Sequence, residues 1–403
     1  MRILFVGMPS SIHAARWISQ LTGQQWEIYL FPSTEGDLNS SFHDIKVFAP
    51  SRKFSVKNAR NVRCFRWTVF FTFLDNVTAI ILRRPSLLFR KASLFMIIHI
   101  LKPDVVQSLE VQHAGYLILA VRNRFKNGFP KWILTNWGSD IYLFGRFPEH
   151  QGRIKLALER CDYYSAECQR DIILARKMGF KGKALSVFPN AGGFDLERLK
   201  ELRTAGPVSE RRVIILKGYQ NWAGRALVGI RALALCADVL KGYRVVIYSG
   251  FSEEVTISAH LFTQDTGIPV DFIPQSSHED MLRLYGRSRV YIGLSISDAI
   301  STSLLEAIVM GAFPIQSDTS CANEWIRNGE SGFIVPAEDP EVISRAIREA
   351  ILNDALVDAA NEINSRMARE RLDESVVRPQ VVRMYEEIAA GSLDVEKSDA
   401  KDY

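Results

Sequence analysis

Paired cysteines, long apolar runs and excess charge are all scarce in this chain of 403 residues. Its five cysteines show no C-x-x-C spacing, which argues against both a disulfide framework and a zinc site. No window reaches the roughly 18 uninterrupted apolar residues that a membrane-spanning helix needs. The 50 Lys and Arg residues against 45 Asp and Glu give a formal charge of +5, which by itself is too small to indicate nucleic-acid binding. These absences favour a cytoplasmic protein that is soluble or peripheral to a membrane.

A dinucleotide-binding loop is also missing where a first strand would present it. The apolar run 3–6 predicts a buried strand of a parallel sheet. The residues that follow it begin with Gly7 but do not continue as G-x-G-x-x-G, so this loop is not typical of a dinucleotide site.

Strand and helix patterns alternate through both halves of the chain, which is typical of parallel α/β sheets. The predicted strands are 3–6, 26–31, 44–48, 105–108, 132–135, 163–166 and 184–187, then 213–216, 244–249, 270–273, 290–294, 313–316 and 332–335. The predicted helices between them are 12–21, 113–122, 225–240, 279–287, 303–310 and 341–353. We therefore expect an α/β fold of two similar halves.

The domain boundaries follow from composition. Pro, Asn and Gly cluster at 189–193 before a charged stretch with few apolar anchors, so a boundary is expected near 195–210. We assign 1–195 to a first domain and 205–375 to a second. Residues 376–390 are expected to form a helix that packs back on the first domain, and the polar residues 391–403 a disordered tail.

Residues 294–315 are the most informative segment. A predicted strand ends near Leu294, a short polar turn follows, and an amphipathic helix opens at Ser303. Ser301, Thr302 and Ser303 offer hydroxyls and backbone N–H groups at the helix start, where the helix dipole also favours a phosphate. The turn therefore predicts an anion site.

Two acids flank this turn. Asp298 lies in a loop at the carboxyl end of a strand, where open α/β sheets bind ligands, and Glu306 lies on the first turn of the helix. The alternative is purely structural, because Ser303 and Glu306 also have the Ser-x-x-Glu spacing of a helix capping box. Spacing alone does not decide between the two interpretations.

The segment 294–315 resembles the E-x7-E signature of the retaining glycosyltransferases of family 4, with Asp298 and Glu306 in the two acidic positions. The usual first acid is Glu, so Asp298 reaches one methylene less far. The resemblance implies the GT-B fold, which has two Rossmann-like domains with a cleft between them, and a nucleotide-diphosphate sugar as donor. It also implies that Glu306 holds the donor ribose, that Asp298 approaches the sugar, and that the turn amides hold the diphosphate.

The same resemblance extends to the start of the second half. Lys217, Gly218 and Arg225 lie on a strand-to-helix loop where the family carries an Arg and a Lys that clamp the diphosphate. The match is loose, and Arg225 could instead be an ordinary first-turn surface residue. Phe272 and Ile273, with the proline after them, resemble the strand end that borders the nucleotide base.

Loops of the first half resemble the acceptor side of the family. His13 and Arg16 match an H-x-x-R-W segment, although a helix-start His is commonly a cap or core residue. Trp137 and Asp140 match an H-G-x-D segment with Trp in place of His, and His113 lies in a further loop of this kind. The last strand of this half and the segment 189–195 also resemble the family, the latter its P-N-G-x-D interdomain motif.

The small net charge hides one strongly basic stretch. Residues 51–102 contain eleven Lys and Arg against the single acid Asp75, whereas the rest of the chain carries 39 basic and 44 acidic residues. Bulky apolar and aromatic residues are interleaved with the cations, a mixture that favours an anionic membrane surface. A helix pair with a solvated basic face would explain the same pattern. The high aliphatic content speaks against nucleic acid.

These features together predict a retaining hexosyltransferase that moves a sugar to a glycan or polyprenyl-linked acceptor in bacterial surface polysaccharide assembly. No D-x-D metal motif occurs, so no cofactor and no metal ion are expected. The predicted partners are the nucleotide sugar, the acceptor, and the anionic inner face of the cytoplasmic membrane. A transferase with a small soluble acceptor and a non-catalytic GT-B binding subunit are the alternatives. Donor sugar, base, linkage and oligomeric state are not determined by the sequence.

Overall fold

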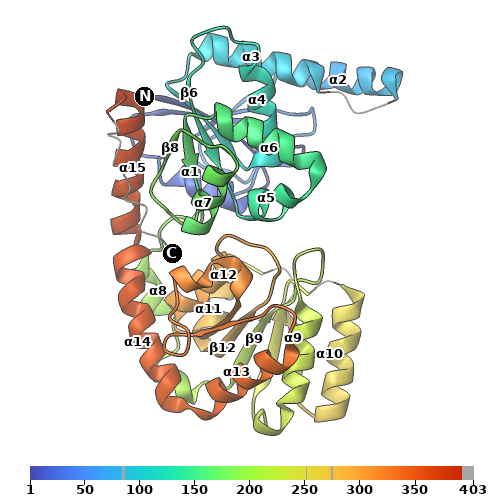
Figure 1. Cartoon of the computed structure of the whole chain (residues 1–403), viewed down its shortest axis with the longest axis vertical. Helices are drawn as coiled ribbons and strands as arrows, with labels where there is room; N and C mark the ends of the chain where they lie inside the picture. Colours follow the sequence, from blue (N-terminus) through green and yellow to red (C-terminus); the bar gives the residue numbers. More distant parts are fainter. Residues whose placement is uncertain (84–86, 251, 274–275, 393–403) are drawn as a thin grey trace. The chain divides into compact units, whose positions relative to one another are not determined.

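The computed structural model of the chain describes residues 1–83, 87–250, 252–273 and 276–392. It divides into two compact units, the first formed by residues 1–192 with the segment from Arg378 onward, and the second by Gly193–Val377. Each unit has one parallel sheet with helices on both faces (Figure 1). The predicted α/β class with two Rossmann-like halves is confirmed. Most of the tail expected at 391–403 lies outside the described residues.

The sheet of the first unit has the strand order β4-β3-β2-β1-β5-β6-β7-β8, with every pair parallel. Its strands are β1 (Arg2–Gly7), β2 (Glu27–Pro32), β3 (Lys46–Phe48), β4 (Arg63–Phe65), β5 (Val105–Leu109), β6 (Lys131–Thr135), β7 (Tyr163–Ser165) and β8 (Lys183–Ala184). Its helices are α1 (Ile12–Ser19), α2 (Val69–Leu82), α3 (Leu88–Leu101), α4 (Tyr116–Arg122), α5 (Ser139–Tyr142), α6 (Pro148–Arg160) and α7 (Gln169–Lys177), with a 3₁₀ turn at Phe144–Arg146. The order reverses between β1 and β5, so the loops after these two strands lie at the position where such sheets bind ligands.

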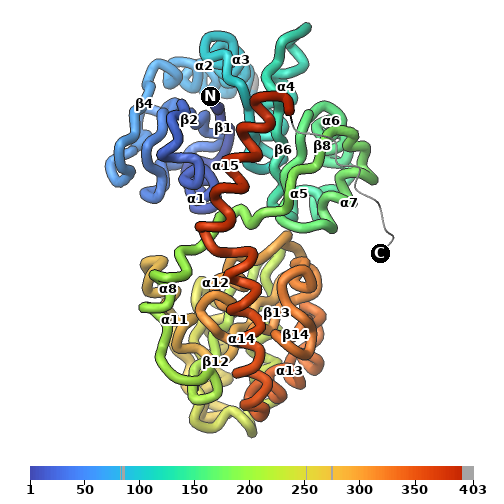
Figure 2. The backbone as a smooth tube through the Cα atoms, turned by 90° about the vertical axis from the view of Figure 1, so that its left-hand side faces the viewer, coloured from blue at the N-terminus to red at the C-terminus, as the bar shows by residue number. Residues whose placement is uncertain are grey.

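Helix α15 (Glu374–Ala390) is tied to the first unit from Arg378 onward (Figure 2). The indole Nε1 of Trp17 donates to the Tyr385 hydroxyl at 2.9 Å, and that hydroxyl donates to the amide oxygen of Gln107. Arg378 donates to the carbonyl oxygens of Gln20 and Thr22 at 3.1 and 2.7 Å. These buried contacts join α15 to α1 and to β5.

Helices α5, α6 and α7 of the first unit were not among the predicted elements, and three further elements differ from the sequence-based predictions. Strand β4 was not predicted, because it is a three-residue edge strand with no fully buried side chain. The predicted helix 113–122 is α-helical only from Tyr116 onward, because its first three residues belong to a π-helix at Val111–Gly115. The predicted strand 184–187 pairs over only two residues, Lys183–Ala184.

The sheet of the second unit has the order β11-β10-β9-β12-β13-β14, again all parallel. Its strands are β9 (Val213–Lys217), β10 (Arg244–Tyr248), β11 (Val270–Ile273), β12 (Ser288–Gly293), β13 (Phe313–Ser317) and β14 (Phe333–Val335). Its helices are α8 (Leu196–Leu202), α9 (Ala226–Leu235), α10 (Glu253–Thr266), α11 (His278–Arg287), α12 (Thr302–Met310), α13 (Pro340–Leu352) and α14 (Asp354–Arg371), with 3₁₀ turns at Val208–Glu210, Ala237–Val239, Asp318–Ser320 and Ala322–Glu324. This is the strand order of a dinucleotide-binding Rossmann domain, whose ligand site lies between its first and fourth strands, here β9 and β12.

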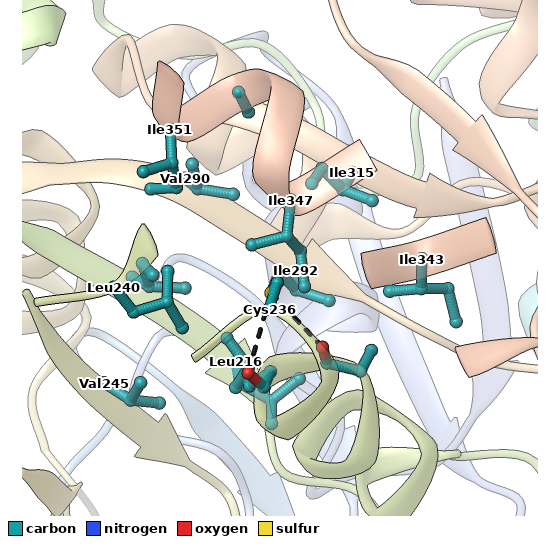
Figure 3. Packing of buried hydrophobic residues seen from close by; sticks show 14 of the residues in the cluster. Leu216, Cys236, Leu240, Val245, Val290, Ile292, Ile315, Ile343, Ile347 and Ile351 are labelled. Carbon is teal, nitrogen blue, oxygen red and sulfur yellow. Dashed lines mark hydrogen bonds between the residues drawn. The ribbon is translucent and has the colours of Figure 1, made fainter. Parts of the chain in front are cut away.

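Two apolar layers enclose this second sheet. On one face Leu216 and Ile292 of neighbouring strands pack against α9 and α13, as Figure 3 shows. On the other face α8, α11, α12 and α14 pack together around Tyr285 and Leu304. All six strands predicted for this half are present, and β9, β10, β12 and β13 are mostly buried, as expected for strands whose two faces are covered.

The charged stretch at the domain boundary is partly helical. Residues 196–202 form α8, whose N-cap Asp195 accepts a hydrogen bond from the Arg198 N–H at 3.0 Å. Leu196 and Leu199 are buried in the second unit, so two apolar residues are enough to fix this short helix to its neighbours.

Candidate active site

The loops after β9 and β12 form the candidate site of the second unit. They are hydrogen-bonded to each other, since the Arg225 N–H donates to the Leu294 carbonyl at 3.1 Å and the Ile296 N–H to the Ala223 carbonyl at 3.0 Å. The predicted motifs around Lys217 and Asp298 therefore lie at one place on the sheet edge. That place is the reversal of strand order at which parallel sheets bind ligands.

Helix α12 opens at this edge as an uncapped helix. Its N-cap is Ser301, whose side chain makes no capping hydrogen bond. Ser303 lies inside the first turn, where its hydroxyl contacts the buried hydroxyls of Tyr248 and Tyr285. The Ser303 to Glu306 capping box, the structural alternative raised from the spacing, is therefore not formed. The helix start at Ser301, Thr302 and Ser303 retains the character of an anion site.

Glu306 is held in place by a histidine that the sequence analysis did not single out. Its Oε1 lies 2.7 Å from Nε2 of His278, the first residue of α11. The Glu306 side chain is only 9% exposed, whereas that of His278 is 45% exposed. The carboxylate is therefore buried, and a half-exposed donor covers it.

Lys217 lies among the predicted acids. Its Nζ is 3.4 Å from the Ser301 hydroxyl. Burial by itself would lower the pKa of Lys217, but the negative potential of Tyr291, Asp298, Tyr219 and Glu306 outweighs it, so the pKa lies above its ordinary value. The lysine therefore stays charged at neutral pH. A fixed cation is thus present beside the turn, close enough to both acids to interact with them electrostatically.

Two glycines shape the loop after β9. A Cβ on Gly218 would lie 2.6 Å from the Cα of Gly250, and a Cβ on Gly224 would lie 2.2 Å from the carbonyl oxygen of Tyr219. Neither distance is possible for a real side chain. Gly218 thus allows the loops after β9 and β10 to touch, and Gly224 closes the turn that brings Arg225 back to the sheet.

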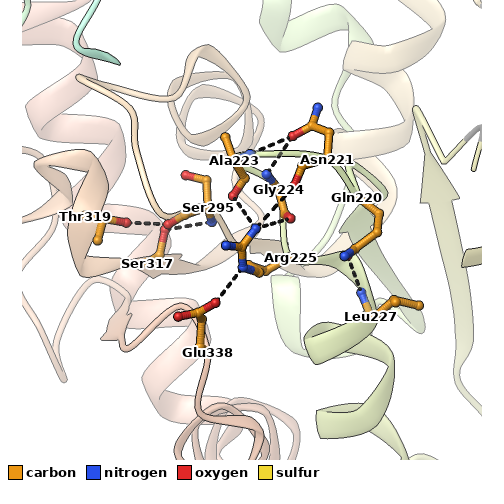
Figure 4. Close-up of polar contacts among 10 residues, drawn as sticks. All are labelled: Gln220, Asn221, Ala223, Gly224, Arg225, Leu227, Ser295, Ser317, Thr319 and Glu338. Carbon is orange, nitrogen blue, oxygen red and sulfur yellow. Dashed lines mark hydrogen bonds and ion pairs between the residues drawn. The ribbon is translucent and has the colours of Figure 1, made fainter. Parts of the chain in front are cut away.

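The side chain of Arg225 stabilises this loop through an ion pair and several hydrogen bonds (Figure 4). Its Nε lies 2.7 Å from Oε1 of Glu338, and its Nη1 donates to the carbonyl oxygens of Asn221, Ala223 and Gly224 at 2.9–3.4 Å. The side chain is 18% exposed. These contacts tie the guanidinium to its own loop, and the predicted role of Arg225 in clamping a diphosphate stays a prediction.

Phe272 and Ile273 end the edge strand β11, and both are half-buried. Ile273 is paired with Tyr248 of β10, so this strand end lies at the same sheet edge as Lys217. The residue after them, Pro274, lies outside the described residues.

In the first unit, the predicted acceptor-side residues lie on neighbouring loops. The rings of His13 and Trp137 meet edge to face with centroids 6.0 Å apart, although one follows β1 and the other follows β6. Arg16 lies one turn after His13 on α1, whose N-cap Ser11 accepts from the Ala14 N–H. His13 is therefore not the capping residue of α1, the structural alternative noted from the sequence.

Asp140 and His113 share an acidic neighbour. The Glu110 carboxylate accepts from the His113 N–H at 2.8 Å and lies 3.4 Å from His113 Nδ1, so it raises the pKa of the imidazole. Asp140 accepts from the Trp137 N–H at 2.8 Å. Burial, and then the charges of Glu110 and Asp171, raise the pKa of the Asp140 carboxyl to about 8. Asp140 is therefore mostly protonated at neutral pH.

The sequence analysis did not single out Glu110 as a site residue. Its unusual backbone conformation points to a functional role, and only the structure reveals it. It has φ 97° and ψ 162°, a region that is almost restricted to glycine and costs about 1–3 kcal/mol. Such strain is typical of functional sites, and Glu110 lies directly after β5, at the reversal of strand order in the first sheet.

Two parallel-sheet units, each with the predicted site residues near its reversal point, define the class of the protein as a GT-B fold. Sucrose-phosphate synthase from Thermosynechococcus elongatus has a similar structure, with a TM-score of 0.68 and 13% identity over 97% of this chain and 100% of that chain. The Anabaena HepE protein in complex with UDP-glucose gives a TM-score of 0.67 and 15% identity over 96% of this chain and 100% of that chain.

Sequence comparison finds two family models that match the chain. The family model "Glycosyl transferases group 1" matches residues 211–369, and "Glycosyl transferase 4-like" matches residues 72–168. Together with the structural neighbours, these matches support a group 1 glycosyltransferase of the family 4 type. A phosphatidyl-myo-inositol mannosyltransferase of Mycobacterium leprae is 32% identical over 93 residues. That match spans 23% of this chain and about a quarter, 25%, of the length of the relative.

Proposed function

We propose that the protein transfers a sugar from a nucleotide-diphosphate sugar to an acceptor, with retention of the anomeric configuration. The observation that carries this proposal is the cluster of Lys217, Ser301, Asp298 and Glu306 at the sheet reversal of the second unit. A buried acid, a fixed cation and an uncapped helix start are the groups that a ribose and a diphosphate require.

Each member of the cluster has a distinct role in the proposed donor site. Glu306 accepts hydrogen bonds from the ribose hydroxyls, for which it exchanges or shares its contact with His278. Lys217 and the amides at the start of α12 stabilise the charge that develops on the leaving diphosphate. Asp298 approaches the sugar. Phe272 and Ile273 border the base. Arg225 keeps the loop that follows Lys217 in shape.

The proposed reaction needs no metal ion. The C1–O bond to the diphosphate breaks while the acceptor oxygen forms its bond from the same face, and the acceptor proton leaves with the diphosphate. Lys217 and the helix start would supply the stabilisation that a divalent cation gives in other phosphate-leaving reactions. Turnover that persists in a chelator supports this part of the proposal, and loss that Mg²⁺ restores contradicts it.

The proposed acceptor is a glycan or a polyprenyl-linked lipid, used in bacterial surface polysaccharide assembly at the inner face of the cytoplasmic membrane. The curated relative is named for transfer to a phosphatidyl-inositol lipid, which supports a lipid-linked acceptor. Within the part of the chain that the structure describes, no helix is long and apolar enough to cross a membrane. Association would therefore have to occur from the surface, and we propose that the basic segment 51–102 provides it.

The donor site is tested with Glu306→Gln and Asp298→Asn against a matched control, Glu362→Gln, whose side chain is exposed on α14 of the same unit. Thermal stabilisation by a panel of nucleotide sugars, starting with UDP-glucose, first identifies the donor. Glu306→Gln should then weaken donor binding by about tenfold to a hundredfold, since one or two charge-assisted hydrogen bonds of about 1.5 kcal/mol are lost. Asp298→Asn should lower turnover more than donor affinity.

Three results would contradict the proposal or part of it. Unchanged transfer in both site variants would remove the assigned donor site. Donor binding without any transfer or donor hydrolysis in the wild type would favour the alternative of a non-catalytic GT-B subunit. Efficient transfer to free sugars, with none to lipid-linked acceptors, would favour the alternative of a small soluble acceptor.

A further inference from the structure

A hollow of about 450 Å³ opens at the edge of the first unit, where the chain leaves β3 and β4. It is lined by Arg52, Arg66, Trp67, Val69, Phe70 and Phe73. The carboxyl ends of these two strands lie at the same edge of the sheet as the loops of His13 and His113, because all strands of this sheet are parallel. The hollow is therefore on the acceptor side of the sheet, and none of the proposed donor residues contributes to it.

Within the described part of the chain, the two arginines of the hollow form no ion pair with an acidic residue. Arg66 donates from Nη1 to the carbonyl oxygen of Arg52 at 3.2 Å and from Nη2 to that of Phe54 at 3.1 Å. These bonds fix the position of the Arg66 guanidinium but leave its charge uncompensated. Among the described residues, no carboxylate lies within ion-pair distance of Arg52 or Arg66. Two guanidiniums beside an otherwise apolar hollow are suited to one phosphate group.

The apolar wall of the hollow continues along one face of α2. Phe70, Phe73, Val77, Ile80 and Ile81 have helical spacing and are 62%, 54%, 36%, 78% and 72% exposed. Trp67, directly before the helix, is 42% exposed. Across the connection to α3, Leu87 and Leu88 are 50% and 51% exposed. Contiguous exposed apolar side chains on this scale mark a binding surface rather than an ordinary solvated face.

Beyond its exposed first residue, helix α3 anchors this hairpin to the core through its buried face. Leu94, Ile97 and Ile98 of α3 are buried in the core of the first unit. Asp75 of α2 accepts from the N–H groups of Phe89 and Arg90 at 2.9 and 2.7 Å, which fixes the start of α3 to α2. The exposed face of α2 is thus held rigidly away from the core, beside α3 (Figure 1).

Not all eleven cations of 51–102 are available to a partner. Arg90 is buried, and its guanidinium donates to the carbonyl oxygens of Pro32 and Thr34, so it belongs to the core. Arg84 lies outside the described residues. Arg52 lines the hollow, and Lys53 and Lys57 follow it closely in the sequence. All three side chains are exposed. Six exposed cations, from Arg52 to Arg66, therefore precede α2, whereas Arg83 follows its C-terminal end.

We propose that the hollow binds an anionic lipid of the bilayer, with the lipid phosphate between Arg52 and Arg66 and the acyl chain along Trp67, Phe70 and Phe73. The inference rests on the membrane association proposed above and assigns it to one face. The remaining apolar face of α2 lies in the interfacial layer, as amphipathic helices with a basic flank do. Val77, Ile80 and Ile81 are aliphatic and cannot stack on bases, so a bilayer fits this face better than a nucleic acid.

The experiment measures co-sedimentation of the full chain with phosphatidylcholine vesicles that contain either no or 30% (about one in three) phosphatidylglycerol. The wild type should bind the anionic vesicles at low salt and the neutral ones far less. Arg52→Ala and its neighbour Lys53→Ala remove the same charge, but only Arg52 lines the hollow. Lys53→Ala should weaken binding by about fivefold at most, the effect of one cation near an anionic surface. Arg52→Ala should weaken it by at least tenfold.

A double substitution of two phenylalanines tests the apolar wall that is proposed to hold the acyl chain. Phe70→Ser/Phe73→Ser should lower vesicle binding by more than tenfold, because two large apolar side chains lose their contact with the lipid. Ile257→Ser/Leu261→Ser on α10 of the second unit is the matched control, since these side chains are 51% and 53% exposed at a helical spacing. This control should bind vesicles like the wild type.

Several outcomes would overturn the proposal. It fails if the wild type does not bind anionic vesicles, or if Arg52→Ala and Lys53→Ala lose the same amount, which would leave only diffuse charge. It also fails if millimolar inorganic phosphate abolishes vesicle binding, since the hollow would then be a site for free phosphate. Donor binding and hydrolysis, measured on the same variants, separate this result from a failure of the proposed transferase, because they depend on Asp298 and Glu306 in the other unit.

Discussion

Replacing Asp140 by Asn should make the stability of the first unit much less dependent on pH. The wild-type carboxyl is 8% exposed, and burial with the neighbouring charges raises its pKa to about 8, against 3.8 for the free side chain. Between these pH values the folded state binds one proton more than the unfolded state. Stability from this group is therefore complete below about pH 4 and is lost as the pH rises toward 8.

The magnitude follows from linkage. Each pH unit within this window lowers the free energy of unfolding by about 1.4 kcal/mol per extra proton bound by the folded state. From pH 5 to pH 7 the wild type should lose roughly 3 kcal/mol through Asp140. Asn has a similar shape, carries no charge, and retains an oxygen that can accept from the Trp137 N–H. The variant should therefore not show this loss.

The assay is urea unfolding at pH 5, 6 and 7, followed by tryptophan fluorescence. Five of the seven tryptophans, at positions 17, 26, 67, 132 and 137, report on the first unit. The quantity compared is the change in unfolding free energy with pH, so a constant cost of the substitution cancels. Glu149→Gln, an exposed substitution on α6, is the control and should keep the wild-type slope. Equal slopes for the wild type and Asp140→Asn would refute the assignment of the proton to Asp140.

Two further substitutions test the packing that positions the sites. Gly224→Ala should destabilise the second unit by about 2 kcal/mol, because the new Cβ would lie 2.2 Å from the Tyr219 carbonyl oxygen. Gly152→Ala is the control, since a Cβ there would meet no atom within 4 Å. The control should be neutral or stabilising in the same urea titration. Tyr385→Phe should lower the free energy of unfolding of the first unit by about 1–3 kcal/mol, since the buried Trp17 Nε1–H loses its acceptor; an unchanged midpoint would contradict the anchoring of α15 to α1.

The strands of the second unit could be predicted from the sequence with little error, whereas its helices α8, α10 and α14 were not predicted. All six strands were expected within two residues of their observed bounds, and α12 begins at Thr302 where Ser303 was expected. The reason is local, since a strand covered on both faces is an unbroken apolar run and α12 ends at Gly311, whose φ of 84° favours glycine. The short edge strand β4 was missed because its side chains are only half-buried or exposed.

The partners within the site could not be predicted in this way. Glu306 was expected to contact a ligand, but the structure also pairs it with His278, a residue of another helix that lies 28 positions earlier in the chain. Arg225 was expected to face a phosphate, and its ion pair with Glu338 spans 113 residues. The strained backbone of Glu110 has no sequence signal at all. In each case the spacing of residue types is compatible with many partners, and it does not select one.

The sequence by itself determined the α/β class, the alternation of elements, the two acids at 298 and 306, and the concentration of positive charge in 51–102. These properties depend on composition and on periodicity over a few residues, which the chain carries locally. Only the tertiary structure decided which groups meet. The order of the parallel strands brings the ends of β9 and β12 together, and burial removes Arg90 from the basic surface while it leaves Arg52 and Arg66 at an apolar hollow. Such pairings depend on contacts between residues far apart in the chain, and for that reason the function of a charge cannot be assigned before its neighbours are known.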